Sequence, residues 1–265
     1  MPTLPPADIE AFARDGIVAS YPVLDDAERE AALETIALMK SQPVSIRGGL
    51  LMHKSHLVSR RLADICRKPA ITDRVAALIG PDLLVWGGGF FIKEAHSPTY
   101  VSWHQDATYW GLEPADIVTA WVALTPSTHE SGCLRVVPGS HTWPIMAHRE
   151  TFAEGNLLSR GQEIAIDVDE TTTREIPLAQ GEMSIHHVKI AHNSEPNRAD
   201  HARIGFAIRY VATHVRPAAR DGAMLARGTD TVGNFEPEEG GQGELAPADL
   251  AHHAASLEAD RVRPR

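Results

Sequence analysis

The chain has 265 residues, enough for one large domain with a sizeable buried core. Its formal net charge of -10 excludes the basic face that nucleic-acid binding requires, so we expect a small-molecule substrate and no nucleic-acid partner. The two cysteines, Cys66 and Cys133, are too far apart in sequence to form a metal-binding motif, which favours a reducing compartment. The N-terminus lacks a signal-peptide pattern, and no apolar run approaches the roughly 20 residues that cross a bilayer. We therefore predict a cytoplasmic protein without membrane contact.

The first 80 residues are predicted to be mainly helical. Gly16 is placed to end a first helix, and Asp25 with Glu28 forms the capping-box pattern that begins a second one, which Pro43 stops. Residues 43–60 favour an exposed loop or a ragged strand, and a loop that covers the active site is the alternative. Helices are predicted over 8–14, from Asp25 to Pro43, over 59–67 and over 71–79.

After Pro81 the pattern changes from helical to extended. Short apolar segments are separated by Pro, Gly and Ser turns, and no helices alternate with them, so the sequence predicts a mainly β fold with flanking helices, a sandwich or jelly roll. A turn or bulge is expected at residues 87–89, three consecutive glycines, because no helix start follows to make a phosphate loop. Strands are predicted over 83–86 and 90–92, around His104, and over 118–124, 134–137, 164–168, 183–187 and 203–211.

The strand over 203–211 has two different faces. One face is apolar and includes Phe206 and Tyr210, so it is expected to pack against the core. The other face places two small residues between Arg203 and Arg209, which leaves room for a ligand and supplies guanidinium groups suited to carboxylates. An ordinary amphipathic strand with solvated arginines is the alternative interpretation.

The C-terminal region is predicted to be a loop followed by a helix. Residues 228–244 are rich in Gly and Glu and indicate a loop, whose closure over the site is an open question. A helix is expected over 248–258, with His252 and His253 on its surface rather than at a metal. The whole chain, 1–265, is thus predicted to be a single domain with an N-terminal helical part (1–80), a jelly-roll core (81–215) and a C-terminal loop and helix (216–265).

The segment around His104 carries the strongest chemical signal. His104 and Asp106 are two residues apart, so in an extended strand they share a face and can bind one metal ion. A third ligand is expected from His192, with His186 and His187 as alternatives. Two imidazoles and one carboxylate leave the opposite coordination positions open, which suits non-haem Fe(II) oxygenases. The triplet alone is a weak signal, because such short motifs also occur by chance.

Five sequence blocks surround these residues: 103–106 (WHQD), 120–124 (AWVAL), 132–141 (GCLRVVPGSH), 192–197 (HNSEPN) and Arg203. In content, order and spacing they resemble the phytanoyl-CoA dioxygenase family of Fe(II)- and 2-oxoglutarate-dependent oxygenases. One departure is that residues 130–132 are Glu-Ser-Gly, where the family often has Glu-Asn-Gly. This difference lies in a loop, so it bears on substrate placement more than on catalysis.

The resemblance implies a double-stranded β-helix, a cupin-like jelly roll that holds metal and co-substrate between two sheets. It implies Fe(II) and 2-oxoglutarate as cofactors, dioxygen as a reactant and ascorbate as a possible stimulant. Arg203 would bind the far carboxylate of 2-oxoglutarate, and Ser194 matches a hydroxyl that assists this arginine. The site residues assigned in this way are His104, Asp106 and His192 for iron, and Arg203, Ser194, Trp121 and Gln105 for the co-substrate pocket.

The implied activity is hydroxylation of an unactivated C–H bond of a small metabolite, coupled to conversion of 2-oxoglutarate into succinate and carbon dioxide. Desaturation or cyclisation at the same site is an alternative. Halogenating relatives have a small residue at the position of Asp106, so the carboxylate favours hydroxylation here. A rival interpretation is a cupin-like protein that binds metal or ligand without turnover, against which Arg203 and Ser194 count. A polar or anionic substrate is favoured by four cationic side chains, Arg47, Lys54, Arg135 and Arg209. The sequence does not determine the oligomeric state.

Overall fold

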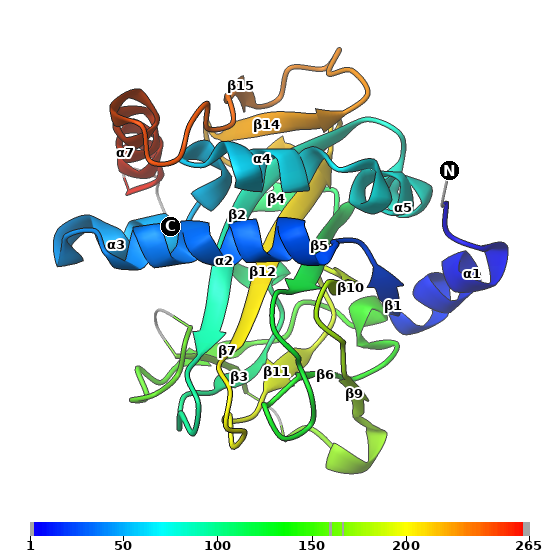
Figure 1. Cartoon of the computed structure of the whole chain (residues 1–265). Coiled ribbons are helices and arrows are strands. Elements are labelled where there is room, and N and C mark those ends of the chain that lie inside the picture. Colours follow the sequence, from blue (N-terminus) through cyan, green and yellow to red (C-terminus); the bar gives the residue numbers. More distant parts are fainter. Residues whose placement is uncertain (1–2, 159–160, 166, 262–265) are drawn as a thin grey trace.

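The computed structural model describes residues 3–158, 161–165 and 167–261, and within them two sheets, antiparallel except for the pair β14–β15, face each other (Figure 1). The larger sheet has the strand order β1 (Ile17–Pro22), β10 (Glu182–His187), β5 (Ile117–Ala123), β12 (Arg203–Ala212), β2 (Leu83–Lys93), β14 (Gly222–Arg227) and β15 (Glu236–Pro237). The smaller sheet has the order β3 (Val101–His104), β11 (His192–Ser194), β6 (Leu134–Val136) and β9 (Arg174–Ile176). Two short pairs lie outside them, β4 (Leu112–Glu113) with β13 (Arg216–Pro217) and β7 (His148–Glu150) with β8 (Gln162–Ile164). This arrangement confirms the predicted jelly roll.

Helices cover the face of the larger sheet that points away from the smaller one (Figure 1). The α-helices are α1 (Pro6–Asp15), α2 (Asp26–Lys40), α3 (Val44–Met52), α4 (Arg60–Arg67), α5 (Pro69–Ile79), α6 (Ala107–Trp110) and α7 (Pro247–Arg261). Three single 3₁₀ turns are η1 (Ser55–Leu57), η2 (Ser140–Thr142) and η3 (Glu170–Thr172). Among the described residues, no helix is long and apolar enough to cross a membrane.

The predicted helix ends are confirmed. Gly16 closes α1 with a φ of 76°, a left-handed conformation that glycine adopts without strain. The side chain of Asp25 accepts a hydrogen bond from the Glu28 N–H at 2.9 Å, and Glu28 accepts one from the Asp25 N–H at 2.9 Å. This capping box satisfies backbone donors that would otherwise have no partner in the helix.

The loop predicted over residues 43–60 is wrong, because this segment forms α3 and η1. Gly48 and Gly49 disfavour a helix intrinsically. Tertiary packing overrides this preference, since Leu50 is buried and a side chain at Gly49 would begin 3.0 Å from Leu257 of α7. The helix is therefore held by Leu50 and by the contact at Gly49, whereas Gly48 itself is exposed.

The glycines at 87–89 lie inside one continuous strand, β2, rather than in a turn. A bulge does occur, at Trp86, where the pairing with β12 shifts register between Arg209 and Tyr210. A Cβ atom at Gly89 would lie 2.3 Å from the carbonyl oxygen of Met52. Glycine is required there because the end of α3 approaches the backbone of β2 so closely.

Three further expectations are changed by the structure. The N-terminal part is not wholly helical, since β1 extends the larger sheet by pairing with β10. The strand predicted over 164–168 is replaced by β8, which ends at Ile164, and Ile166 lies outside the described residues. His253 is buried rather than at the surface, with Nε2 2.7 Å from the carbonyl oxygen of His53, whereas His252 is exposed.

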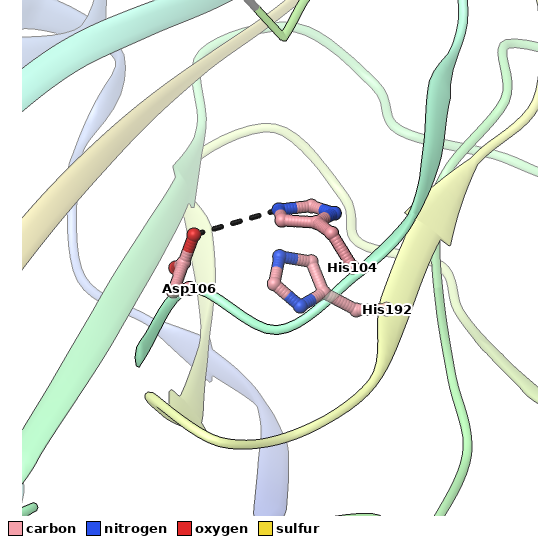
Figure 2. Close-up of side chains that lie close together, drawn as sticks. All are labelled: His104, Asp106 and His192. Carbon is pink, nitrogen blue, oxygen red and sulfur yellow. Dashed lines mark ion pairs between the residues drawn. The ribbon is translucent and has the colours of Figure 1, made fainter. Parts of the chain in front are cut away.

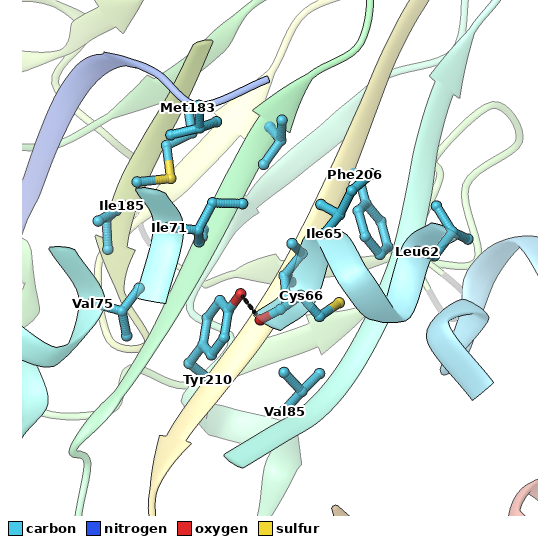
Figure 3. Close-up of a cluster of buried hydrophobic side chains, with 14 of the residues drawn as sticks. Leu62, Ile65, Cys66, Ile71, Val75, Val85, Met183, Ile185, Phe206 and Tyr210 are labelled. Carbon is cyan, nitrogen blue, oxygen red and sulfur yellow. Dashed lines mark hydrogen bonds between the residues drawn. The ribbon is translucent and has the colours of Figure 1, made fainter. Parts of the chain in front are cut away.

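The main core lies between the helices and the apolar face of β12 (Figure 3). The ring of Phe206 stacks on that of Phe90 with centroids 4.8 Å apart, and the hydroxyl of Tyr210 donates a hydrogen bond of 2.8 Å to the carbonyl oxygen of Cys66 in α4. Burying each such side chain stabilises the fold by about 1.5–3 kcal/mol. The predicted alternation along β12 is confirmed, and it leaves Arg203 and Arg209 on the inner face.

Candidate metal centre and co-substrate pocket

A cavity between the two sheets contains the candidate site. The larger sheet contributes residues of β2, β5, β10 and β12, and the smaller sheet contributes residues of β3, β6 and β11. The lining consists of Phe91, Val101, His104, Asp106, Thr119, Trp121, Leu134, His186, His192, Asn193, Ser194, Arg203, Ala207 and Arg209. Polar groups at both ends of the cavity flank an apolar middle.

His104, Asp106 and His192 converge at one wall of this cavity (Figure 2). One ligand atom of each lies within 4.8 Å of the others. His192 is the cross-strand partner of His104, and their ring centroids are 4.0 Å apart. His104 Nε2 lies 3.4 Å from Asp106 Oδ1. The sequence predicted His104 and Asp106 on the same face of one extended strand. In the structure β3 ends at His104, and Asp106 is the residue before α6 rather than a strand residue.

The backbone orients both imidazoles. Nδ1 of His104 lies 2.9 Å from the carbonyl oxygen of Ser102, and Nδ1 of His192 lies 3.0 Å from that of Ile190. A carbonyl oxygen can only accept, so each Nδ1 carries the proton and each Nε2 keeps a free lone pair. Such outer hydrogen bonds are what set the tautomer of metal-binding histidines.

Burial and charge favour the protonation states that metal binding needs. Burial, together with the nearby His104, lowers the pKa of His192 well below its ordinary value. Burial alone would raise the pKa of Asp106, but the nearby rings of His104 and His192 and the guanidinium of Arg209 hold it below its usual range. The site thus presents a neutral His192 imidazole and a carboxylate anion near neutral pH.

Neither of the two alternative histidines belongs to the group of converging ligand atoms. The ring centroid of His186 is 4.9 Å from that of His192, but its ligand atoms do not converge with the other three. His187 is the next residue of β10 and so faces the opposite side of the sheet, where its ring lies 6.3 Å from Phe12 and its Nδ1 accepts a hydrogen bond from the Lys189 N–H. The geometry groups His192 with His104 and Asp106.

Arg203 lies at one end of the cavity and is almost fully buried. Its Nη1 donates to the carbonyl oxygen of Gly132 at 2.7 Å, while its buried Nε has no hydrogen-bond partner. The guanidinium lies 5.2 Å from the centre of the Trp121 ring, which fits only because residue 205 is glycine. Burial lowers the pKa of Arg203 to about 10, so it remains charged at neutral pH.

Lys93 is a residue of this region that the sequence analysis missed. It is the cross-strand partner of Arg203 and is fully buried. Its Nζ donates to Ser194 Oγ at 2.7 Å, to the Ser194 carbonyl oxygen at 3.1 Å and to the carbonyl oxygen of Glu195. Burial, together with the nearby Arg203, lowers the pKa of Lys93 to about 6. The sequence signal that could have identified this residue is a lysine at the end of the apolar run of β2.

Gln105 does not line the cavity as the family comparison implied. Its amide nitrogen donates to the carbonyl oxygen of Lys189 at 2.9 Å, and its amide oxygen accepts from the Met146 N–H at 2.8 Å. These bonds hold the turn between His104 and Asp106 against two neighbouring segments. Gln105 is therefore placed to position the metal ligands rather than to contact the co-substrate.

The four cationic residues that favoured an anionic substrate have different surroundings in the structure, and only one of them faces the cavity. Lys54 is buried in an ion pair of 2.8 Å with Glu238, and 3.7 Å from Asp221, which brings residue 238 of the 228–244 segment against η1. Arg135 pairs with Glu195 at 2.9 Å and with Glu170. Arg47 donates to a backbone carbonyl at 3.5 Å and lies outside the cavity lining. Of these four side chains, Arg209 alone lines the cavity.

A jelly roll that holds two imidazoles and a carboxylate around an internal cavity, with a buried arginine at its end, defines the class of Fe(II)- and 2-oxoglutarate-dependent oxygenases. The chain belongs to the phytanoyl-CoA dioxygenase family, because the family model described as Phytanoyl-CoA dioxygenase (PhyH) matches residues 12–205. This range contains all three candidate metal ligands and Arg203.

Individual relatives agree with this assignment. A probable phytanoyl-CoA dioxygenase of Caenorhabditis elegans is 29% identical over 157 residues, which cover 56% of this chain and 50% of the relative. A probable alpha-ketoglutarate-dependent hypophosphite dioxygenase of Stutzerimonas stutzeri is 27% identical over 67% of this chain and 64% of its own length. The match thus spans about half to two thirds of these relatives. A solved structure of the non-heme monooxygenase ThoJ, in its apo form, is 37% identical, with a TM-score of 0.85 over 96% of this chain and 95% of ThoJ.

Proposed function

We propose that the chain is an Fe(II)- and 2-oxoglutarate-dependent dioxygenase that hydroxylates an unactivated C–H bond of a small polar or anionic metabolite. The observation that carries this proposal is the convergence of His104, Asp106 and His192 in a cavity that ends at Arg203.

The three ligands fit a ferrous ion. Two Nε2 lone pairs and a carboxylate occupy one side of a metal, which leaves the other positions for co-substrate and dioxygen. The fixed tautomers mean that the histidines need no rearrangement to bind. We assign His104, Asp106 and His192 to iron on this basis.

The opposite end of the cavity fits the far carboxylate of 2-oxoglutarate. The unpaired Nε of Arg203 needs an acceptor, since a buried donor without a partner costs about 1–3 kcal/mol. Arg203 and the hydroxyl of Ser194 supply donors for a carboxylate, and the Trp121 ring restricts the approach to the guanidinium. Lys93 holds Ser194 in place from behind.

Bound Fe(II) with 2-oxoglutarate supplies the oxidation, in which the C–H compound, dioxygen and 2-oxoglutarate give an alcohol, succinate and carbon dioxide. The protein holds the reactants next to one another and limits access of water through apolar walls that include Phe91, Val101 and Leu134. Asp106 fills the third protein position at the metal, so a halide has no vacated ligand position to enter. We therefore propose transfer of oxygen rather than halogen.

The test is an assay of purified protein with Fe(II), ascorbate, 2-oxoglutarate and candidate compounds under isotopically labelled dioxygen. We expect succinate, a product that carries one oxygen from dioxygen, and no halogen even at high chloride. Asp106→Ala is expected to lose most hydroxylation, because the metal loses one of three protein ligands. A chlorinated product from the unmodified protein would contradict the role of Asp106.

Two other outcomes separate the alternatives. A product that has lost two hydrogens without gaining oxygen would favour desaturation or cyclisation at the same site. No succinate, with or without any candidate compound, would favour a cupin-like protein that binds metal or ligand without turnover.

A further inference from the structure

Three polar side chains form a row across the inner face of the larger sheet, at the end of the cavity away from Arg203. His186 of β10 pairs with Thr119 of β5, and Thr119 pairs with Arg209 of β12. All three line the cavity. On the far side of Arg209 the next partner is Gly87, whose lack of a side chain leaves space beside the guanidinium. We call His186, Thr119 and Arg209 the Arg209 row.

Two buried polar atoms of this row have no partner among the residues that the structure describes. His186 Nδ1 and Thr119 Oγ1 are buried and form no hydrogen bond. Within the described part of the chain, Arg209 forms no hydrogen bond or ion pair, and its guanidinium lies against the Trp110 ring at 5.3 Å from the centroid. Buried polar groups are nearly always paired, and each unpaired one costs free energy. Two such buried atoms beside the partly buried guanidinium of Arg209 indicate that a bound molecule pairs with the row.

The position of the row separates it from the co-substrate end. Arg203 and Arg209 lie on the same face of β12, six residues apart, which is about 20 Å along a strand. A five-carbon diacid bound at Arg203 is too short to reach Arg209 as well. Arg209 is therefore available for a second anion, and it lies near Asp106, whose carboxylate acts on it electrostatically.

We infer that the Arg209 row is the subsite for the primary substrate, and that it binds the carboxylate of a small monocarboxylic acid. This inference rests on the proposed function, because it concerns the compound that is oxidised. A guanidinium offers two parallel N–H donors that match the two oxygens of a carboxylate, and that of Arg209 lies over the Trp110 ring. Thr119 and His186 can donate to the remaining lone pairs without adding charge. Arg209 carries one positive charge and has no ion-pair partner in the described chain, so it matches the one negative charge of a monocarboxylic acid.

The experiment compares acids with their uncharged amides. Phenylacetate with phenylacetamide, and hexanoate with hexanamide, are titrated calorimetrically into protein loaded with Fe(II) and 2-oxoglutarate without oxygen, and succinate formation is then measured in air. We expect at least one acid to bind roughly 10- to 100-fold more tightly than its amide, the range of a charged hydrogen-bonded pair. Arg209→Gln is expected to remove this preference while the requirement for 2-oxoglutarate stays unchanged.

Two further variants control for local unfolding. Thr119→Val keeps the shape of the side chain and removes one donor, so it is expected to weaken the acid roughly three- to tenfold and to leave the amide unchanged. Arg47→Gln removes the same charge from a residue outside the cavity lining, and it is expected to leave both affinities unchanged.

The inference is overturned if no acid binds more tightly than its amide, or if Arg209→Gln retains the preference for the acid. It is also overturned if Arg209→Gln raises the 2-oxoglutarate requirement in place of the acid affinity, since Arg209 would then belong to the co-substrate site. Failure of the proposed function looks different. In that case the wild-type protein binds an acid in the calorimeter but forms no succinate in air.

Discussion

Replacing Gly205 with alanine tests how the co-substrate pocket is built. The added Cβ would lie 1.9 Å from Cζ2 and 2.3 Å from Cε2 of Trp121, whereas carbon atoms in contact are normally separated by about 3.5–4.0 Å. The ring would have to move by roughly 1.5 Å, away from its place beside Arg203. Gly205 does not have a left-handed backbone conformation, so the effect comes from the methyl group itself.

We expect this overpacking to cost about 1–3 kcal/mol, because Trp121 is buried among well-packed neighbours. For a chain of this size, each kcal/mol lowers the melting temperature by roughly 2–4 °C. The apparent affinity for 2-oxoglutarate should fall about tenfold, since the displaced ring intrudes where the carboxylate would meet Arg203. Differential scanning fluorimetry and succinate formation at varied 2-oxoglutarate measure the two effects.

A matched control is Gly48→Ala in α3, where an added Cβ meets no atom within 4 Å. This change should stabilise the protein by about 0.5–1 kcal/mol, through helix propensity alone, and leave the 2-oxoglutarate requirement unchanged. Unchanged melting temperature and unchanged affinity in Gly205→Ala would refute the reasoning, because Trp121 would then not lie against Gly205.

Three other predictions follow from the site and the core. His192→Ala should abolish Fe(II) binding and turnover with little loss of fold, while His187→Ala should keep both; the reverse result in a metal-binding assay would assign the third ligand to His187. Arg203→Lys should raise the 2-oxoglutarate requirement about tenfold, because an ammonium group cannot reproduce the planar fork, and an unchanged requirement would contradict the assignment. Burial lowers the pKa of His187 to about 4 and that of His56 well below its ordinary value, so between about pH 6.5 and 4 the unfolded chain binds more protons than the folded one. The melting temperature of metal-free protein should therefore fall as pH decreases through this window, and a flat profile would argue against these buried neutral histidines.

The structural features that were predictable from the sequence are those that depend on interactions between residues close together in the chain. The capping box at Asp25, the left-handed Gly16 and the alternation along β12 each depend on a few neighbouring residues, so their patterns survive folding unchanged. The candidate ligands His104, Asp106 and His192 were named from short motifs and a family resemblance, and the structure brings them together.

Features that depend on distant segments were decided by the tertiary structure. The helix α3 contains two glycines and is held by the burial of Leu50 and by the approach of Leu257 of α7 to Gly49. In β2, residue 89 has to be glycine because the backbone of Met52 lies so close to it. No local pattern contains such contacts, since the partners are far apart in sequence.

The same distinction applies to the charged residues of the site. The sequence determined that arginines and lysines were available, but not which of them would be neutralised by a partner. Glu238 reaches Lys54 from 184 positions away, whereas Arg209 forms no ion pair with an acidic side chain in the described chain. Strand register alone put Lys93 beside Arg203, and Arg209 in line with Thr119 and Gly87. An ion pair or an empty place beside a guanidinium is a property of three-dimensional packing, and it is this packing that decides which charge remains free to bind a ligand.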